Sequence, residues 1–496
     1  MFFICLVLCG VCISAILLVM RSLQTIFKKI ESIRNHKAID WIACFLTALF
    51  ILAGALVSLN RYWQYETFYY NFGVFDQAIW QVSRFQPPVI EHLLVGGRVL
   101  FADHFDLSIL LLAPIFWITE RSEALLIAQA IVTGLAGLVM YQIGTIVLRN
   151  KILAFSIVWC YFFFVGIQNA VITDFHEITI MTLPLALTFW AIVTKRIKTF
   201  WVSFLITLGF KEVTFLLGIG IAIFLFFYQK EWRRQAIIAG IVSLIWGYLA
   251  MKVFIPYFSG GVYLHWPNFP DTLLGKAFAL VDYPSKRETV FYSFLQFGFL
   301  PLFSPSLWFA IFQDYLIRFL PKYTYTYWTL GLHYNAIVAV LLTVSSIFGL
   351  SFFVRYKLVK RFVYVIALCL MLNAFVQFRF IHHGPFLLAI NPVFYEHTKD
   401  FVFLDELVAR IPKDVSVMTQ NNLGVRFDHQ QFIYLREVYE PYKPEYVLID
   451  NRDGQNPNNF LFGPDIPGLI SKLEQDSNYE LIYHEGEQYI FQRKVE

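Results

Sequence analysis

The sequence predicts a polytopic α-helical membrane protein that ends in a small soluble α/β domain. Of its 496 residues, 58% are hydrophobic and only 15% are charged, whereas soluble domains carry about 25% charged residues. Apolar runs of roughly 18 or more residues recur along most of the chain. These runs are continuous rather than alternating, which indicates membrane helices and excludes a barrel of alternating strands.

Charge and cysteine usage exclude several classes of protein. The net charge of +4 comes from Lys and Arg in short loops, so we expect no nucleic-acid partner. The six cysteines lie inside apolar runs, and none stands beside a histidine at zinc-binding spacing. We interpret them as small buried hydrophobic residues rather than metal ligands or disulfide partners.

The first apolar run, residues 2–20, is expected to be an anchor rather than a cleaved signal peptide. No basic segment precedes it, and the basic stretch 21–37 follows it. Basic loops favour the cytoplasm, which places the N-terminus outside and makes residues 60–121 one long outer loop. Within that loop, the apolar segment 106–119 is too short to span comfortably, so we expect an interfacial helix.

Two helical hairpins are predicted within the membrane domain. Residues 200–228 have basic residues on both flanks, so the chain must turn within this stretch, and Lys211–Glu212 is its charged break. Runs 289–303 and 306–320 form a second hairpin, with Pro305 near its turn. Counting runs gives about twelve spans, with both termini outside a cell membrane that we expect to be the bacterial inner membrane.

The last hundred or so residues have a different pattern. Short strand-like segments "DVSVM", "FIYLR", "EYVLID" and "LIYHEGEQYIFQR" alternate with turn residues, and "DFVFLDELVARI" and "GLISKLEQD" have the pattern of helices. We therefore expect three parts: an anchor and basic loop at 1–39, a multi-span domain at 40–380, and an outer-face α/β domain at 381–496.

Candidate chemical groups gather on the predicted outer face, whereas the long spans carry few charges at mid-depth. A carrier should show more ionisable residues inside its spans. Asp76, in "NFGVFDQAIWQ", lies among aromatic residues, and partial desolvation would raise its pKa and its basicity. The alternative is a solvated loop acid, and position alone does not separate the two readings.

Two polar clusters have an ordinary structural explanation beside a functional one. Asp103 and His104 in "ADHFD" suit a metal or phosphate site, but Asp103 is by itself better explained as a helix cap. In "TDFHEIT", residue 180 is Ile, so the HExxH zinc motif fails. Asp174, His176 and Glu177 remain as a polar cluster in a tight loop, which favours a functional role modestly.

Two further positions stay open. Lys211 could neutralise a phosphate, or it could pair with Glu212 near the lipid headgroups. His333 and Tyr334, in "GLHYN", stand at the start of a span, where an interfacial belt is the favoured explanation.

The order of these features resembles that of the C-type glycosyltransferases (GT-C fold). More narrowly, the chain is similar to an uncharacterised family of predicted prokaryotic membrane proteins, a domain of unknown function related to that superfamily. The resemblance covers roughly residues 40–450. It rests on the ordered segments "FGVFDQAIW", "ADHFDLSILLLAPIFWI", "DFHEIT", "KEVTFLLGIG", "FLPLFSPSLW" and "LHYNA".

The resemblance implies transfer of a sugar from a polyprenyl-phosphate donor to a saccharide, lipid or protein acceptor on the outer face, in the cell envelope. It gives Asp76 the role of base and Lys211 a place at the donor phosphate. Acids of the second outer loop bind a metal, Mg or Mn, in some such enzymes, although His176 between the acids departs from that pattern. The implied substrate contacts are Gln77, Lys211, His333 and Tyr334, and the implied metal ligands are Asp103, His104, Asp174, His176 and Glu177.

A carrier or flippase of lipid-linked saccharides is the first alternative, and a non-catalytic envelope assembly protein is the second. An enzyme should gather its acids and Lys211 around one outward cavity. We therefore expect Asp76 and the "DFHE" loop to open onto the same cavity, with Lys211 on its rim.

Overall fold

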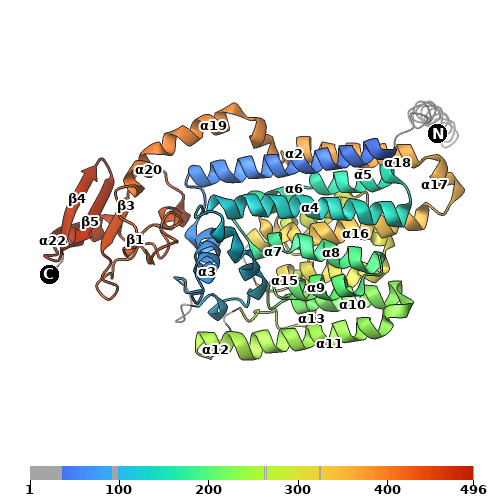
Figure 1. Cartoon of the computed structure of the whole chain (residues 1–496), viewed down its shortest axis with the longest axis horizontal. Coiled ribbons are helices and arrows are strands. Elements are labelled where there is room, and N and C mark those ends of the chain that lie inside the picture. The colour runs from blue at the N-terminus through green and yellow to red at the C-terminus, as the bar shows by residue number, and fades with distance from the viewer. Residues whose placement is uncertain (1–35, 92–98, 262, 264, 323–324, 495–496) are drawn as a thin grey trace.

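The computed structural model describes residues 36–91, 99–261, 263, 265–322 and 325–494. The predicted anchor at 2–20 and nearly all of the basic stretch after it lie outside the described residues. The rest forms a helical bundle with a small sheet at one end, as Figure 1 shows.

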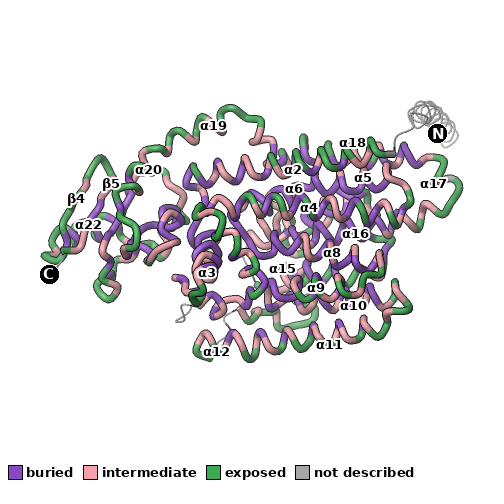
Figure 2. The backbone as a smooth tube through the Cα atoms, in the orientation of Figure 1, coloured by how far each residue is buried: buried purple, intermediate pink, exposed green. Residues whose placement is uncertain are grey.

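Five described helices are long and apolar enough to cross a membrane, and a pair bent by 51° makes up to six. Their core helices are α2 (His36–Trp63), α4 (Glu123–Leu148), α11 (Arg233–Leu249), α16 (Ala336–Phe353) and α18 (Val363–Val376), and the bent pair is α5 (Lys151–Phe162) with α6 (Val165–Ile172). The predicted count of about twelve spans is not confirmed, because several of the predicted spans form helices too short to cross. Figure 2 shows buried residues along the facing sides of these helices.

Small residues allow α4 to lie close to its neighbours. A Cβ atom added at Gly144 would lie 2.8 Å from the Cβ of Ala154 on α5, and one added at Gly137 would lie 2.4 Å from the Phe162 ring. Apolar side chains gain little by leaving lipid for a helix interface, so close backbone approach supplies much of the packing in membrane bundles.

The predicted first hairpin is confirmed. Helix α9 (Ile197–Leu208) and helix α10 (Thr214–Tyr228) are separated by a break that contains Lys211 and Glu212. The 12 residues of α9 rise about 18 Å, well short of a hydrocarbon core of about 30 Å. The hairpin is therefore built from two helices that are each shorter than a membrane span.

The segment 106–119 packs on this hairpin. It forms a 3₁₀ helix, Leu107–Trp117, which lies against α3 (Val74–Ser83). The backbone N–H of Ser108 donates to the Gly209 carbonyl at 2.8 Å, and Ser108 Oγ would lie 2.2 Å from a Cβ added at Gly209. The N-cap residue of this helix is Asp106, not Asp103, so the explanation of Asp103 as a cap of this helix is wrong.

The second predicted hairpin is also present, as α14 (Pro284–Gln296) and α15 (Trp308–Phe319). It buries charged groups that the sequence analysis did not single out. Arg318 Nη1 lies 3.1 Å from Asp314 Oδ2, and Lys286 Nζ donates to the carbonyls of Ala279 and Phe319 at 2.5 and 2.9 Å. Each of these cations has partners, as buried charges require.

The remaining helices of the membrane region are short. They are α7 (Glu177–Ile180), α8 (Thr182–Val193), α12 (Ile255–Ser259), α13 (Leu273–Ala279), α17 (Lys357–Arg361) and α19 (Pro392–Thr398).

The C-terminal strands form one five-stranded sheet in the order β2-β1-β3-β5-β4. Strand β1 pairs in parallel with β2 and β3, whereas β3–β5 and β5–β4 are antiparallel. Helices α20 (Val402–Val408) and α22 (Ile466–Gln475) fall where the sequence predicted them. The strands are β1 (Val417–Thr419), β2 (Phe432–Tyr434), β3 (Tyr446–Asp450), β4 (Tyr479–Glu485) and β5 (Gln488–Arg493).

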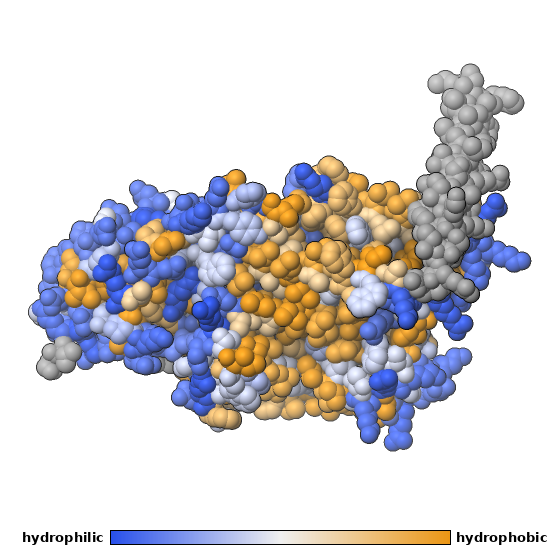
Figure 3. Space-filling view, turned by 45° about the horizontal axis from the view of Figure 1, so that its top comes forward, coloured by the Kyte–Doolittle hydropathy of each residue, from blue (hydrophilic) through white to orange (hydrophobic). Residues whose placement is uncertain are grey.

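The two ends of the bundle differ. Figure 1 places α3, α12 and the sheet at one end, and α17 and the start of α2 at the other. In Figure 3 the surface over the bundle is mainly hydrophobic and that over the C-terminal sheet is mainly hydrophilic. This arrangement matches the predicted grouping of the outer loops with the C-terminal region.

Candidate active site

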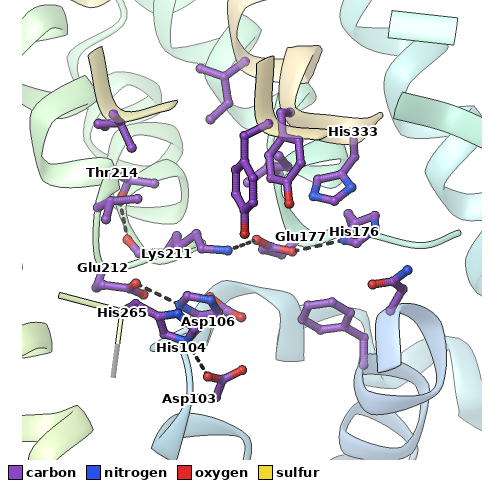
Figure 4. A pocket seen from close by; sticks show the side chains of 18 of the residues that line it. Asp103, His104, Asp106, His176, Glu177, Lys211, Glu212, Thr214, His265 and His333 are labelled. Atoms are coloured by element: carbon purple, nitrogen blue, oxygen red, sulfur yellow. Dashed lines mark hydrogen bonds and ion pairs between the residues drawn. The ribbon is translucent and has the colours of Figure 1, made fainter. Parts of the chain in front are cut away.

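A cavity of about 370 Å³ opens among loops and helix ends at the end of the bundle that carries α3 and α12. Its lining comes from seven separate stretches of sequence and is rich in ionisable groups (Figure 4). The acids are Glu91, Asp103, Asp106, Glu177, Glu212 and Asp314, and the basic groups are His104, His176, Lys211, His265, Arg318 and His333.

Lys211 and Glu177 form an ion pair across this cavity. Lys211 Nζ, at the tip of the α9–α10 hairpin, lies 2.7 Å from Glu177 Oε1, at the start of α7 (Figure 4). Burial alone would lower the Lys211 pKa, but the carboxylates of Glu177 and Asp106 raise it well above its usual range. Lys211 is therefore protonated. Its side chain is 23% exposed and lines the cavity.

His104 and Glu212 form a second pair. Nδ1 of His104 lies 2.8 Å from Glu212 Oε1, and the Tyr263 hydroxyl donates to the same oxygen at 2.9 Å. Burial would lower the His104 pKa, yet the Glu212 carboxylate raises it to about 9. Burial likewise opposes ionisation of Glu212, but His104 lowers the Glu212 pKa to about 2. Both groups are charged at neutral pH.

Asp106 lines the same cavity and differs from the other acids. Only 1% of the residue is exposed, and its Oδ1 atom has no hydrogen-bond partner within the described part of the chain. Burial and the Glu177 carboxylate raise the pKa of Asp106 well above its usual range, against the opposing effect of Lys211. In its ionised form, a buried acid with a raised pKa and an unpaired acceptor atom has the properties of a general base.

A third cluster could hold a cation. His265 Nε2 lies 2.5 Å from Asp103 Oδ1, and the rings of His104 and His265 stack at 4.0 Å between centroids. Potential ligand atoms of Asp103, His104 and His265 all lie within 4.8 Å of one another. An acid with two imidazoles suits Mn²⁺ or Zn²⁺ better than Mg²⁺.

His176 and His333 form a stacked pair on the cavity wall, with ring centroids 3.4 Å apart. Burial lowers the His176 pKa to about 4, so its imidazole is neutral at physiological pH. Tyr334 stacks on Tyr327 at 4.4 Å, and its backbone carbonyl accepts from Arg318 Nη1 at 3.1 Å. Both His333 and Tyr334 therefore lie in the cavity, which the interfacial-belt explanation did not predict.

Three predicted site residues lie elsewhere. Asp76, Gln77 and Asp174 are absent from the described residues that line the cavity. Asp76 is fully buried, and Asp76 Oδ1 lies 3.2 Å from His429 Nε2. The predicted meeting of Asp76 and Asp174 with Lys211 is therefore not observed, and the physical reason is helix geometry. Consecutive residues of α3 point in directions about 100° apart, so Phe75 lines the cavity while Asp76 does not.

Gln77 and Asp174 have other partners. Gln77 Nε2 donates to the Gln430 carbonyl at 2.9 Å, which links α3 to the C-terminal region. Asp174 accepts from Asn71 Nδ2 at 2.9 Å and is 3% exposed. The five predicted metal ligands consequently do not form one site, because Asp103 and His104 gather with His265 whereas His176 and Glu177 face Lys211.

Sequence reasoning did not single out His265, Asp314 or Arg318 as site residues. Asp314 and Arg318 stand four residues apart in an apolar run, and this i, i+4 spacing of opposite charges was a usable signal. His265 lies in an irregular loop, and no spacing in the sequence connects it with Asp103.

The fold of this chain is GT-C-like. Its structure is similar to that of ArnT from Cupriavidus metallidurans bound to undecaprenyl phosphate, which is a GT-C glycosyltransferase. The TM-score is 0.55 over 91% of this chain and 97% of that chain, at 9% sequence identity. At this identity the likeness supports the helical, GT-C-like part of the predicted fold and says nothing about activity.

The chain belongs to the family described as predicted membrane protein (DUF2079), whose model matches residues 61–490. No protein with curated function matches the sequence significantly.

Proposed function

We propose that this protein is a glycosyltransferase that moves a sugar from a polyprenyl-phosphate donor to an acceptor on the outer face of a cell membrane. The observation that carries the proposal is the position of Lys211, a charged ammonium held at the tip of a short hairpin inside a partly apolar cavity. The similarity in fold to ArnT, whose structure contains undecaprenyl phosphate, supports the same assignment.

The donor site needs a cation for the phosphate and apolar walls for the first part of the lipid. Lys211 supplies the positive charge, and His104 adds a second one nearby. Val213, Leu217 and Ile337 line the same cavity as these cations. Glu177 holds the ammonium in place until the phosphate of the donor competes for it.

The acceptor reaction needs a base, and the geometry favours Asp106 over Asp76. An acceptor hydroxyl oxygen attacks the anomeric carbon of the sugar, and the bond from that carbon to the phosphate oxygen breaks. The hydroxyl proton passes to Asp106, and polyprenyl phosphate leaves with the bonding electrons, its charge balanced by Lys211. Asp106 Oδ1, an acceptor atom without a hydrogen-bond partner among the described residues, is the atom that takes this proton.

A divalent metal would be held by Asp103, His104 and His265, whose ligand atoms lie close enough together, and its binding would require His104 to lose its proton. Such an ion would neutralise the charge that develops on a departing phosphate. Because Lys211 already supplies that neutralisation, the proposed reaction proceeds through Lys211 and needs no metal.

Binding of undecaprenyl phosphate to the purified protein tests the donor site. Losing one charge-assisted phosphate contact costs about 1.5–3 kcal/mol, so Lys211→Met should weaken binding by roughly 10- to 100-fold. Lys195→Met is the matched control, because Lys195 is more than half exposed and pairs with Glu231. Equal affinity of the wild type and Lys211→Met would contradict the proposed donor site.

A further inference from the structure

A second group of potential metal ligands lies away from the cavity, where α3 meets the C-terminal region. Its members are Asp76 of α3 and Asp428 and His429 of the segment between α21 (Asn421–Gly424) and β2. One ligand atom from each residue lies within 4.8 Å of the other two. None of the three lines the cavity of the proposed donor and acceptor sites, as far as the described residues show.

The two carboxylates are buried more deeply than their partners explain. Asp76 is 0% exposed and Asp428 is 2% exposed, and Oδ2 of each has no hydrogen-bond partner among the described residues. Two buried carboxylates side by side repel one another, and each unpaired oxygen costs free energy. A positive species between the two acids would relieve this cost.

The imidazole is fixed in place toward Asp76. Nε2 of His429 lies 3.2 Å from Asp76 Oδ1 and 4.0 Å from Asp428 Oδ1. The ring stacks on Trp80 at 4.9 Å between centroids, and Phe116 contacts it edge-on at 5.1 Å. A ring held between two aromatic side chains is oriented before any ligand arrives, which lowers the entropy cost of binding.

We propose that Asp76, Asp428 and His429 bind one divalent transition-metal ion, with Zn²⁺ the best match, which joins α3 to the C-terminal region. Imidazole and carboxylate are both ligands of Zn²⁺, and with three protein ligands the fourth position is left for water. The ion compensates both buried charges at once and occupies the unpaired oxygens.

The proposed ion would add to existing contacts across the same interface. Arg426 lies over the Tyr62 ring at 3.6 Å and donates to the Tyr62 carbonyl at 2.9 Å, and Arg436 pairs with Glu91 at 2.5 Å. These contacts would keep the C-terminal region docked after metal removal but with lower stability. The ion would thus stabilise the helix that carries Phe75, a cavity residue, without entering the cavity itself.

The experiment measures metal content and thermal stability of the full-length protein in detergent. After chelation and addition of Zn²⁺ alone, elemental analysis should give about one more Zn²⁺ per chain in the wild type than in Asp428→Asn or His429→Gln. Chelation should lower the wild-type Tm by roughly 5 °C, and Zn²⁺ should restore it. Both variants should have low Tm values that Zn²⁺ does not change.

Two controls separate this site from other effects. His265→Gln removes the cavity cluster and should leave the Zn²⁺-dependent rise in Tm intact. Arg436→Gln breaks a different contact of the interface, so it should lower the Tm without changing metal content. Because wild-type chelation requires no substitution, a variant that fails to fold does not block the test.

Equal Zn²⁺ content in the wild type and Asp428→Asn, or a wild-type Tm that does not change on chelation, would overturn the proposal. A wild-type Tm that depends on pH but not on Zn²⁺ would also overturn it, and would instead indicate one proton shared between Asp76 and Asp428. The result of this metal test does not depend on undecaprenyl phosphate binding, which the Lys211→Met variant tests separately.

Discussion

Lys211 and Glu177 come from two separate helical elements, and Lys211 Nζ lies 2.7 Å from Glu177 Oε1 at the cavity. Lys211 lies between α9 and α10, and Glu177 begins α7, which leads directly into α8. The pair therefore joins the ends of two short helical segments. It also explains how a lysine can remain charged at a buried position, since its partner compensates the cost of desolvation.

Removing one charge of this pair should lower the stability of the protein, whereas removing both charges should lower it much less. Glu177→Gln leaves the Lys211 ammonium without its carboxylate, and we expect a loss of stability of about 2 kcal/mol, below the range for a fully buried pair because the lysine is partly exposed. The double variant Glu177→Gln/Lys211→Met should recover most of that loss. Unfolding in detergent measures the stability of the wild type, of each single variant and of the double variant. If the losses of the two single variants simply added up in the double variant, the proposed coupling would be contradicted.

Two glycines on neighbouring helices should respond differently to alanine. A Cβ at Gly220 of α10 would lie 2.7 Å from the Ala310 backbone of α15, whereas a Cβ at Gly240 of α11 would meet nothing closer than 3.8 Å. Gly220→Ala should destabilise the bundle by roughly 1–3 kcal/mol and displace the hairpin that carries Lys211. Gly240→Ala, the matched control, should be neutral or stabilising. Similar Tm values for the two variants would contradict the packing.

Asp174 should make stability depend on pH. Burial raises its pKa from 3.8 to about 6, although Arg61 and the Asn71 hydrogen bond oppose the shift. An acid whose pKa is raised by folding stabilises the protein fully below its unfolded pKa, and this contribution is lost as pH rises through about 6. Asp174→Asn removes that dependence.

The gain in stability of Asp174→Asn over the wild type should therefore increase across this pH window, toward about 3 kcal/mol, and stay level above about pH 7. Unfolding in detergent at a series of pH values measures the difference. A difference that does not change with pH would show that folding does not shift the Asp174 pKa.

The sidedness of the bundle is testable with single cysteines. In a variant without native cysteines, cysteine at the exposed position Asp453 should react with an impermeant reagent added outside intact cells. Cysteine at the exposed position Lys360 should react only after permeabilisation, because α17 lies at the opposite end of the bundle. Labelling of both positions from the same side would contradict the proposed orientation.

The sequence predicted most accurately those features that depend on local pattern. Basic residues on both flanks of 200–228 required a turn, and Lys211–Glu212 was the only charged break within it. The alternating segments of the C-terminal region were sufficient to predict strands β1 to β5. The span count is not confirmed, because an apolar run of a given composition does not reveal whether its helix crosses or turns back.

The site was harder to predict because it depends on which way single side chains point. Asp76 and Phe75 are neighbours in the sequence, yet only Phe75 lines the cavity. Asp103 and His265 are far apart in the sequence, yet Asp103 Oδ1 lies 2.5 Å from His265 Nε2 in the structure. No local pattern encodes either relationship, whereas Lys211, Glu177, His333 and Tyr334 reached the cavity because their segments all end at the same level of the bundle.

The most direct test of the proposed function is mass spectrometry of lipid-linked sugars and envelope glycans in a strain that lacks this protein. The deletion should accumulate a polyprenyl-phosphate sugar and lose one glycan modification, and the wild-type gene should restore both. Asp106→Asn, produced at the same level and still binding undecaprenyl phosphate, should restore transfer at a rate roughly 100-fold lower or less, the scale expected for loss of a general base. Unchanged glycans in the deletion strain, or full restoration by Asp106→Asn, would contradict the assignment.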